Sequence, residues 1–400
     1  MRSAVPSSTS AELQTAKLGT GEVPWPVEKP SQAELEELLS RVNANGTTGR
    51  PGEAGMELMV DTMEPSGQLI CGPPPAGPDR AFRLKDCVGQ LVRAVRPTPV
   101  VRLDFPGIKL HAKLEQHGLV GSVKDRAALW ILKSAIERGT IGPGSPVVES
   151  SSGNFAIALA VYSRLLGLDF TPVIDPNISP LYESSLRSLC RTVVKVDQRD
   201  DTGGFLKTRL ATVRNVLQAS PGAFWPNQYA NVDGMMGHYH LTGAEICSCL
   251  PDIDFVFVGV SSAGTIAGIS QRLKERFPHA KVIAVDAEGS VIFGGSPKKR
   301  HIPGIGSSVV PDLLQHARID DWVLVREADT VAACRELVER HQLFVGGSSG
   351  SVYHAIKQYF GVPRSRRTEP TVLFLCADRG AAYLDTVYDD GWCAKLEEAG

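Results

Sequence analysis

The sequence GSVKDR, residues 121–126, lies between two segments of different periodicity and decides how the rest of the chain is interpreted. The apolar run Lys109–Leu114 before it predicts a strand, and an apolar pattern at helical spacing begins near Asp125. Lys124 therefore falls at the turn into a helix, where unpaired backbone N–H groups and the helix dipole favour an anionic neighbour. A lysine considered alone is more often a solvated surface charge, so its role depends on what the chain places beside it.

Three turns rich in glycine and serine follow this lysine along the chain. They are SSSGN at 150–154, SSAGT at 261–265 and GGSSG at 346–350. Each comes after an apolar run and opens a helix, and small residues there let the backbone approach an anion closely. A cofactor with a phosphate, a ring nitrogen and an aldehyde requires such turns, a neutral hydrogen-bonding group and an amine for a Schiff base. The four segments together predict a site for a cofactor of this kind.

At these residues the chain resembles the pyridoxal-phosphate enzymes of the cysteine synthase and tryptophan synthase β group, known as fold type II. The resemblance covers roughly residues 88–392. Within that family, the stretches PNISP, NQYAN, GHYH, DAEGSVIFG and PGIG are most similar to the siderophore-pathway N-(2-amino-2-carboxyethyl)-L-glutamate synthases, which make a precursor of 2,3-diaminopropionate. The resemblance implies pyridoxal 5'-phosphate as the cofactor, amino acids as small-molecule substrates, and a homodimer.

The composition excludes several other classes of protein. The 400 residues, 42% of them hydrophobic, can bury a large core and suggest two domains, or one domain with appendages. The net charge of −2 argues against nucleic-acid binding, and no apolar run approaches the length of a membrane span. The N-terminus lacks the apolar core of a secretory signal. The eight cysteines are scattered, and the close pair Cys247 and Cys249 has no second pair to complete a zinc site. We therefore expect reduced thiols in a cytoplasmic protein, and no metal.

The first 85 residues contain 10 of the 27 prolines and little periodic apolar pattern, which predicts a largely unstructured extension. One helix is expected near residues 31–42, because Ser31 and Glu34 have the spacing of a capping box and leucines follow at helical spacing. Two interpretations stay open for this helix: it frays in isolation, or it docks on the enzyme body or on a partner subunit.

From Val88 onward, predicted strands and helices alternate. A strand is expected after Thr98-Pro99, and the later predicted strands are short β-branched runs at 146–148, 171–174, 193–196, 255–258, 282–285 and 371–375. The helices between them are expected at 127–137, 156–166, 204–217, 266–277 and 331–341. This alternation predicts an α/β fold with parallel sheets covered by helices.

Periodicity alone does not distinguish one doubly wound domain from two. The resemblance implies the two-domain fold type II architecture. Residues 86–114 and 231–395 would form a large cofactor-binding domain, and residues 115–230 a smaller, mobile substrate domain. The cofactor would lie in the cleft between them.

The resemblance also assigns the residues that hold the cofactor. Lys124 would form the Schiff base, Asn154 would bond the ring hydroxyl, and Ser348 would bond the pyridine nitrogen. The phosphate would be bound by Ser261, Ser262, Ala263, Gly264 and Thr265, although Ala263 stands where relatives often have glycine or threonine and offers backbone only. A neutral serine at the ring nitrogen makes the ring a weaker electron sink than a carboxylate would, which favours elimination and replacement at Cβ over transamination.

The substrate residues are assigned in the same way. The resemblance places Ser151, Ser152 and Gly153 at the substrate α-carboxylate. It makes Arg209 a ligand for a substrate anion, and it turns Gln228 and Tyr229 toward the cleft. By default, Arg209 would be a solvated arginine and Tyr229 a packing residue. Phe155 departs from the cysteine synthases, which usually carry threonine there. The histidines of GHYH, His238 and His240, are interpreted as structural, since residues two apart cannot share a helical face.

Three functions are compatible with this pattern. The leading one is β-replacement, in which O-phospho-L-serine loses phosphate and the amine of L-glutamate adds to Cβ. The alternative is a cysteine synthase that uses sulfide with O-phosphoserine or O-acetylserine. A third is a non-catalytic paralogue that binds cofactor or a partner, and the intact lysine and turns argue against it.

Overall fold

The computed structural model describes residues 80–200, 203–361 and 369–399, which belong to one compact unit, Leu69–Gly400. Helix α3 (Arg80–Ala94) is the first described element, and it begins inside the stretch assigned to the N-terminal extension. The helix predicted near residues 31–42 lies outside the described residues. The division of the rest into residues 115–230 and two flanking segments stays a prediction.

The larger sheet has six strands in the order β1-β2-β9-β6-β7-β8. They are β1 (Val100–Leu103), β2 (Lys109–Leu114), β6 (Phe255–Gly259), β7 (Lys281–Ala287), β8 (Asp321–Val325) and β9 (Thr371–Cys376). Most residues of β6, β7 and β9 are buried, as apolar strands covered on both faces should be. β1 and β2 pair antiparallel, while the other pairs are parallel. The antiparallel pair departs from the predicted parallel pattern because residues 104–108 are too few for a crossover connection.

A second, smaller sheet contains the parallel strands β3 (Pro146–Ser150), β4 (Asp169–Ile174) and β5 (Val194–Lys195). The runs predicted at 146–148, 171–174 and 193–196 are confirmed as these strands. Apolar residues of β3 and β4 share a buried cluster with helices α4 (Lys124–Glu137) and α5 (Asn154–Leu166).

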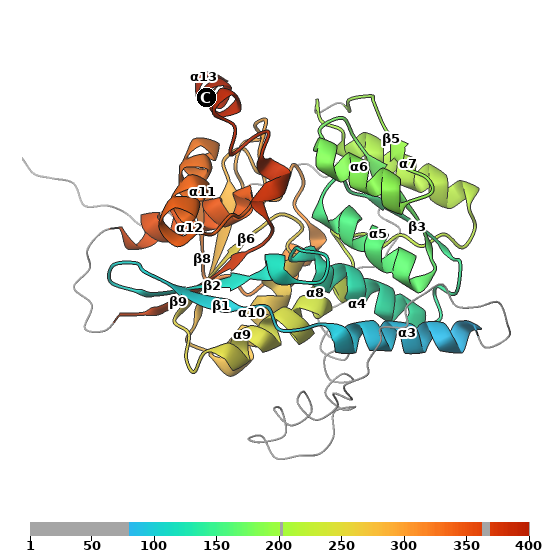
Figure 1. Cartoon of the computed structure of the whole chain (residues 1–400), viewed down its shortest axis with the longest axis horizontal. Helices are drawn as coiled ribbons and strands as arrows, with labels where there is room; N and C mark the ends of the chain where they lie inside the picture. The colour runs from blue at the N-terminus through green and yellow to red at the C-terminus, as the bar shows by residue number, and fades with distance from the viewer. Residues whose placement is uncertain (1–79, 201–202, 362–368, 400) are drawn as a thin grey trace, which may run out of the picture. The chain divides into compact units, whose positions relative to one another are not determined.

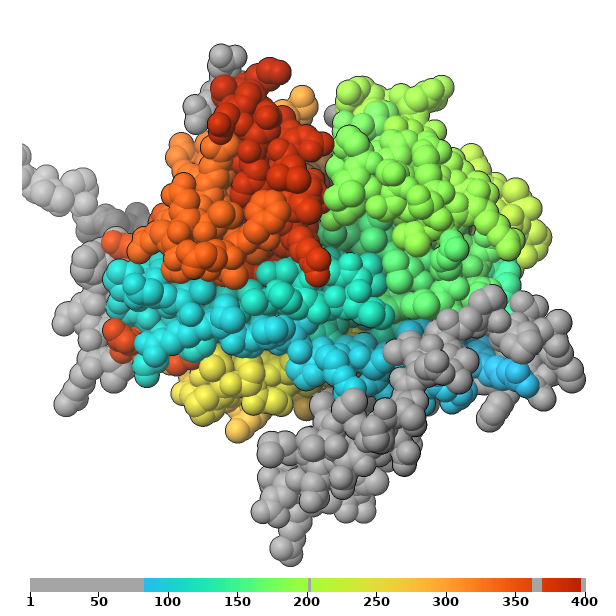
Figure 2. All heavy atoms as spheres, in the orientation of Figure 1, coloured from blue at the N-terminus to red at the C-terminus, as the bar shows by residue number. Residues whose placement is uncertain are grey.

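The other helices alternate with the strands and confirm the α/β fold (Figure 1). They are α6 (Pro180–Leu189), α7 (Leu206–Ala219), α8 (Val232–Gly237), α9 (Ala244–Cys249), α10 (Gly264–Arg276), α11 (Glu327–His341), α12 (Gly347–Phe360) and α13 (Asp390–Ala399). Short 3-10 turns occur at η1 (Glu115–His117), η3 (Asp312–His316) and η4 (Gly380–Tyr383). Helix α12 packs on the large sheet, and its Tyr353 shares a buried cluster with Leu110 of β2. Figure 2 shows the atoms of β1 and β2 (cyan) beside those of the C-terminal helices (orange).

Helix α10 approaches the segment that joins α8 to α9 very closely. This segment is a π-helix, η2 (His238–Gly243). A Cβ placed on Gly268 of α10 would lie 2.3 Å from Met235 O and 2.7 Å from His238 Cβ. A Cβ on Gly243 would lie 2.8 Å from Arg272 Cβ. Two glycines without side chains therefore permit the contact that brings the first turn of α10 to His238.

Among the described residues we find no helix with the length and apolar character that a bilayer crossing requires.

Candidate active site

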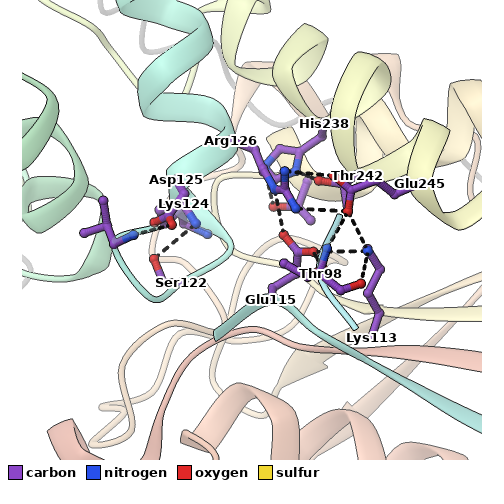
Figure 3. Close-up of polar contacts among 12 residues, drawn as sticks. Thr98, Lys113, Glu115, Ser122, Lys124, Asp125, Arg126, His238, Thr242 and Glu245 are labelled. Carbon is purple, nitrogen blue, oxygen red and sulfur yellow. Dashed lines mark hydrogen bonds and ion pairs between the residues drawn. The ribbon is translucent and has the colours of Figure 1, made fainter. Parts of the chain in front are cut away.

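Lys124 is the first residue of α4, at the turn where the sequence places it. Asp125 holds that turn, since its Oδ2 accepts the backbone N–H groups of Val120 and Gly121 at 2.8 and 3.2 Å. Figure 3 shows Lys124 with Asp125 and Ser122, whose Oγ accepts the Lys124 N–H at 3.2 Å. Burial lowers the pKa of the Lys124 ammonium, and the carboxylate of Asp378 opposes this effect. The amine is thereby shifted toward the neutral form that a nucleophile and base requires.

A pocket lies beside this lysine, and the empty space in and at the mouth of it is about 270 Å³. The predicted site residues that line it are Lys124, Gln228, Ser262, Gly264 and Thr265. Its other lining residues are Ala127, Ile131, Phe155, Gly234, His238 and Leu313. Segments separated by more than a hundred residues of sequence therefore meet around one amine.

The turn before α10 presents donors to this pocket. Ala263 has a left-handed backbone, with φ of 63°, and directly precedes the first residue of the helix, Gly264. No described side chain caps the first turn of α10, so its N–H groups are open to an anion. The hydroxyls of Ser262 and Thr265 lie in the same wall. Ser261 differs from them, because its hydroxyl donates to Gly306 O at 3.1 Å.

Asn154 takes part in a partly buried hydrogen-bond network that the sequence did not reveal. Its Nδ2 donates to Asp378 Oδ2 at 2.6 Å, and its Oδ1 accepts from the Tyr182 hydroxyl at 2.5 Å. The Tyr383 hydroxyl donates to the same Asp378 oxygen at 2.8 Å. Burial raises the pKa of Asp378, while the Asn154 and Tyr383 donors and Lys124 lower it. Asp378 is thus the carboxylate whose charge acts on Lys124.

Ser348 is the second residue of α12 and is only 6% exposed. A Cβ on Gly259, at the end of β6, would lie 3.9 Å from Ser348 Cβ, so the serine lies beside the strand that leads to the α10 turn. It is not among the residues that line the pocket.

Arg209 projects from α7 onto the turn at 151–153. Its Nη1 donates to Ser152 Oγ at 2.9 Å, and its Nε lies 3.3 Å from Asp175 Oδ2. Ser152 Oγ also donates to Asp175 Oδ2 at 3.2 Å. The Arg209–Asp175 contact is an ion pair without hydrogen-bond alignment, and the buried Nε–H has no acceptor among the described residues. Ser151 is buried, and Gly153 precedes the first residue of α5.

Gln228 is held on β3 by a buried glutamate that sequence reasoning missed. Glu149 accepts the Trp225 indole N–H at 3.1 Å and the Gln228 backbone N–H at 3.4 Å. Burial raises the pKa of Glu149 to about 7, against these hydrogen bonds. Burial also raises the pKa of Tyr229, while Arg209 and Arg300 lower it. Phe155 is 2% exposed and lines the pocket, where it presents an apolar ring.

A second polar cluster lies under the other side of α4 (Figure 3). Glu115 accepts from Arg126 Nε at 3.2 Å and from the Thr98 hydroxyl at 2.5 Å. Glu245 accepts from Arg126 Nη2 at 3.0 Å and from Lys113 Nζ at 2.7 Å. The charges of the two cations, Arg126 and Lys113, are therefore balanced in the interior by those of the two glutamates.

Comparison with known proteins identifies the family. The family model described as pyridoxal-phosphate dependent enzyme matches residues 91–377. This chain belongs to the pyridoxal-phosphate dependent enzyme family. The resemblance expected from the sequence, and pyridoxal 5'-phosphate as the cofactor, are thereby confirmed.

Named relatives extend this result. The chain is 44% identical over 322 residues to the N-(2-amino-2-carboxyethyl)-L-glutamate synthase of Ralstonia nicotianae, which covers 79% of this chain and 92% of the relative. It is 42% identical to the protein of the same name in Cupriavidus metallidurans, over 76% of this chain and 91% of the relative. The solved O-acetylserine dependent cystathionine beta-synthase of Helicobacter pylori has a TM-score of 0.67 at 27% identity and covers 76% of this chain and 97% of that structure.

The pocket fits the cofactor of this pyridoxal-phosphate dependent enzyme. The uncapped first turn of α10, with the hydroxyls of Ser262 and Thr265, suits a phosphate. Lys124, shifted toward its neutral form, suits an aldehyde. Three carboxylates at the site could not be found by motif: Asp378, Asp175 and Glu149. Each pairs with a group far away in sequence and was recognisable only as an ordinary polar residue.

Proposed function

We propose that this protein catalyses a β-replacement in which O-phospho-L-serine and L-glutamate form N-(2-amino-2-carboxyethyl)-L-glutamate with release of phosphate. The observation that carries the proposal is the match to two synthases of that name, which extends over 92% and 91% of their lengths. The site residues support it, because each half of the reaction finds suitable groups among them.

Pyridoxal 5'-phosphate, when bound, withdraws electrons from Cα of the amino acid joined to it. Lys124 would carry the cofactor, and its amine would take the proton from Cα once the substrate has replaced it. The turn Ser261 to Thr265 would hold the cofactor phosphate, Asn154 the ring hydroxyl and Ser348 the ring nitrogen. Ser348 is a neutral partner, which suits bond breaking at Cβ.

The leaving group of O-phosphoserine is a phosphate, which needs a fixed cation. Arg209 would supply it, since its guanidinium already contacts Ser152 in the turn assigned to the substrate carboxylate. The Cβ–O bond breaks and the phosphate leaves with its electron pair. The Arg209 Nε–H is buried and has no hydrogen-bond acceptor among the described residues, although it lies 3.3 Å from Asp175 Oδ2.

The second half forms a C–N bond between the glutamate amine and Cβ, and a proton returns to Cα. Glutamate brings two carboxylates, whose lost hydration must be offset by cationic or hydrogen-bonding groups. Tyr229 and Gln228 are proposed for this task. Sulfide would need no such groups, and the apolar Phe155 replaces the hydroxyl typical of cysteine synthases.

The proposal extends to four features that the chain alone leaves open. We propose that residues 115–230 act as a mobile substrate domain and that the enzyme is a homodimer. We also propose a reducing, cytoplasmic location, because the eight cysteines are scattered along the sequence. The product would serve as a precursor of L-2,3-diaminopropionate for a siderophore or a peptide natural product.

One experiment tests the reaction. The purified holoenzyme is given O-phosphoserine with L-glutamate, sulfide or ammonia, and the products are read by mass while free phosphate is measured. The expected outcome is the glutamate adduct, formed in preference to cysteine when glutamate and sulfide compete at equal concentration. Cysteine as the dominant product would establish the cysteine synthase alternative. Phosphate release without a product that contains glutamate, sulfide or ammonia would contradict both replacement reactions.

A further inference from the structure

His238 is one of the residues that line the pocket, and its two ring nitrogens contact two hydroxyls. Its Nε2 is 3.2 Å from Thr265 Oγ1, and its Nδ1 is 3.0 Å from Thr242 Oγ1. His238 is 1% exposed and Thr242 is fully buried, so both contacts are shielded from bulk water. Figure 3 shows the bond between His238 and Thr242.

The imidazole is neutral. Burial holds the pKa of His238 well below its usual range, and the positive charges of Lys124 and Arg126 lower it further. A neutral imidazole donates from one nitrogen and accepts at the other, so the two hydroxyls must play opposite roles. The distances alone permit the hydrogen bonds to run from Thr242 through His238 to Thr265, or in the reverse direction.

An anion in the turn removes this ambiguity. A phosphate dianion only accepts hydrogen bonds, so the Thr265 hydroxyl must donate to it and must accept from His238 Nε2–H. Nδ1 is then the acceptor of a hydrogen bond that the Thr242 hydroxyl donates. Each member of the chain donates toward the anion, and successive hydrogen bonds of this kind polarise one another.

We propose that His238 is a positioning residue for the cofactor phosphate, acting through Thr265 as the middle of the relay Thr242–His238–Thr265. The proposal rests on the assignment of Ser261 to Thr265 as the phosphate turn. The local fold supports a dedicated arrangement: the π-helix turns His238 toward α10, and Gly268 admits it at van der Waals contact. His240, two residues later, instead stacks on Trp130 with ring centroids 4.8 Å apart.

Two substitutions of His238 separate the relay from simple packing. Glutamine places its amide near the position of Nε2 and keeps a donor for Thr265. Asparagine is shorter, reaches only toward Thr242, and leaves Thr265 without its donor. His240→Asn is the matched control, because it removes a neighbouring imidazole that has no contact with the turn.

The readout is the dissociation constant of the apoenzyme for pyridoxal 5'-phosphate and for pyridoxal, which lacks the phosphate. We expect His238→Asn to weaken pyridoxal 5'-phosphate binding by about tenfold, the scale of one hydrogen bond to a charged group, and to leave pyridoxal binding unchanged. His238→Gln should remain near wild type, as should His240→Asn. The ³¹P resonance of the bound cofactor should shift in His238→Asn alone.

Each other outcome has a definite meaning. Equal loss of both ligands in His238→Asn, or no loss of either, overturns the relay and leaves His238 as a packing residue. Thr265→Val tests the underlying site separately. If this change leaves pyridoxal 5'-phosphate affinity at the wild-type value, the phosphate turn itself is wrongly assigned. If it weakens binding, His238→Asn should add nothing in that background, and an additive loss contradicts coupling through Thr265.

Discussion

Lys124 and Arg126 are two residues apart on α4, yet they face opposite environments. Arg126 is 2% exposed and forms ion pairs with Glu115 and Glu245. Burial lowers its pKa, but these two glutamates more than offset that effect and raise it. Lys124 has no ion pair with any described residue, and burial lowers its pKa despite the more distant charge of Asp378.

The difference separates a structural charge from a chemical one. A buried charge that serves the fold must be neutralised, or its lost hydration is not recovered. An amine that acts as a nucleophile or base must be able to lose its proton. A close carboxylate would raise the pKa of the ammonium and keep the amine protonated. The same helix turn therefore holds one cation in its charged form and shifts the other toward neutrality.

The strongest way to break this comparison is to remove Lys124. In Lys124→Ala we expect product formation to vanish and borohydride reduction to fix no cofactor to the protein. Because no paired partner is left behind, the unfolding free energy should fall by only about 1 kcal/mol. Activity, peptide mass after reduction, and thermal unfolding check the three parts. A reduced adduct on another lysine would reassign the site.

Glu115 offers the opposite test. Glu115→Gln leaves Arg126 buried with one carboxylate fewer, and breaking such a buried pair costs roughly 3–5 kcal/mol of stability. Chemical denaturation measures the loss. Glu137→Gln is the control: its exposed pair with Lys133 should contribute about 0.5 kcal/mol or less. Similar small losses in both variants would show that the interior cluster is not energetically distinct.

Asp125 lies between the two cations in the sequence, and it adds a pH dependence of stability to the comparison. Burial raises the pKa of Asp125 from 3.8 to about 6, so the folded protein binds this proton more tightly than the unfolded chain does. Stability is therefore largest below about pH 4 for this group and falls as pH rises toward 6. At about 1.36 kcal/mol per pH unit, the loss is roughly 3 kcal/mol.

Asp125→Asn should remove this pH dependence while keeping the turn. Both backbone donors bond the same oxygen, Oδ2, which an amide oxygen can replace. The unfolding free energy of each protein is measured between pH 4 and pH 7, and the difference between them should change across that range. A difference that stays constant with pH would contradict a buried, titrating carboxyl.

The smallest expected effect concerns Arg209, a cation between the two extremes. It is paired with Asp175, yet its buried Nε–H has no hydrogen-bond acceptor among the described residues. Arg209→Ala should remove a contact to the substrate phosphate worth roughly 1.5–3 kcal/mol, and so weaken use of O-phosphoserine by about one to two decades. O-acetylserine, which has no phosphate, should be little affected. Equal loss for both substrates would make Arg209 structural or a ligand for glutamate.

The sequence predicted what depends on local periodicity. The strand at 109–114, the turn at Lys124 and the helices that follow 150–154, 261–265 and 346–350 all lie where expected. Each is determined by residues close together in the chain. Apolar and polar residues alternate in a half-buried strand, apolar residues recur every three or four positions in a helix, and small residues allow the turn between the two. The fold class followed directly from their alternation.

The rest depends on contacts between distant segments. Asp378 reaches Asn154 from the end of β9, and Asp175 reaches Arg209 from the end of β4, so no spacing in the chain could pair them. His238 was interpreted as structural because it lies two residues from His240, and its actual partner, Thr265, lies on another helix. The pairing of Arg126 with two glutamates likewise appears only when β2, η1 and α9 are brought together.

The left-handed backbone of Ala263 has one more consequence. An alanine at φ of 63° carries a conformational cost of about 1–2 kcal/mol, which a glycine would avoid. A glycine, however, would leave the turn free to sample other shapes before an anion arrives. Because the surrounding packing fixes the alanine, the turn is ordered during folding. The entropy cost of ordering it is therefore not subtracted from the free energy of binding. The site is in this sense preorganised, and rigidity rather than an extra contact is what Ala263 contributes.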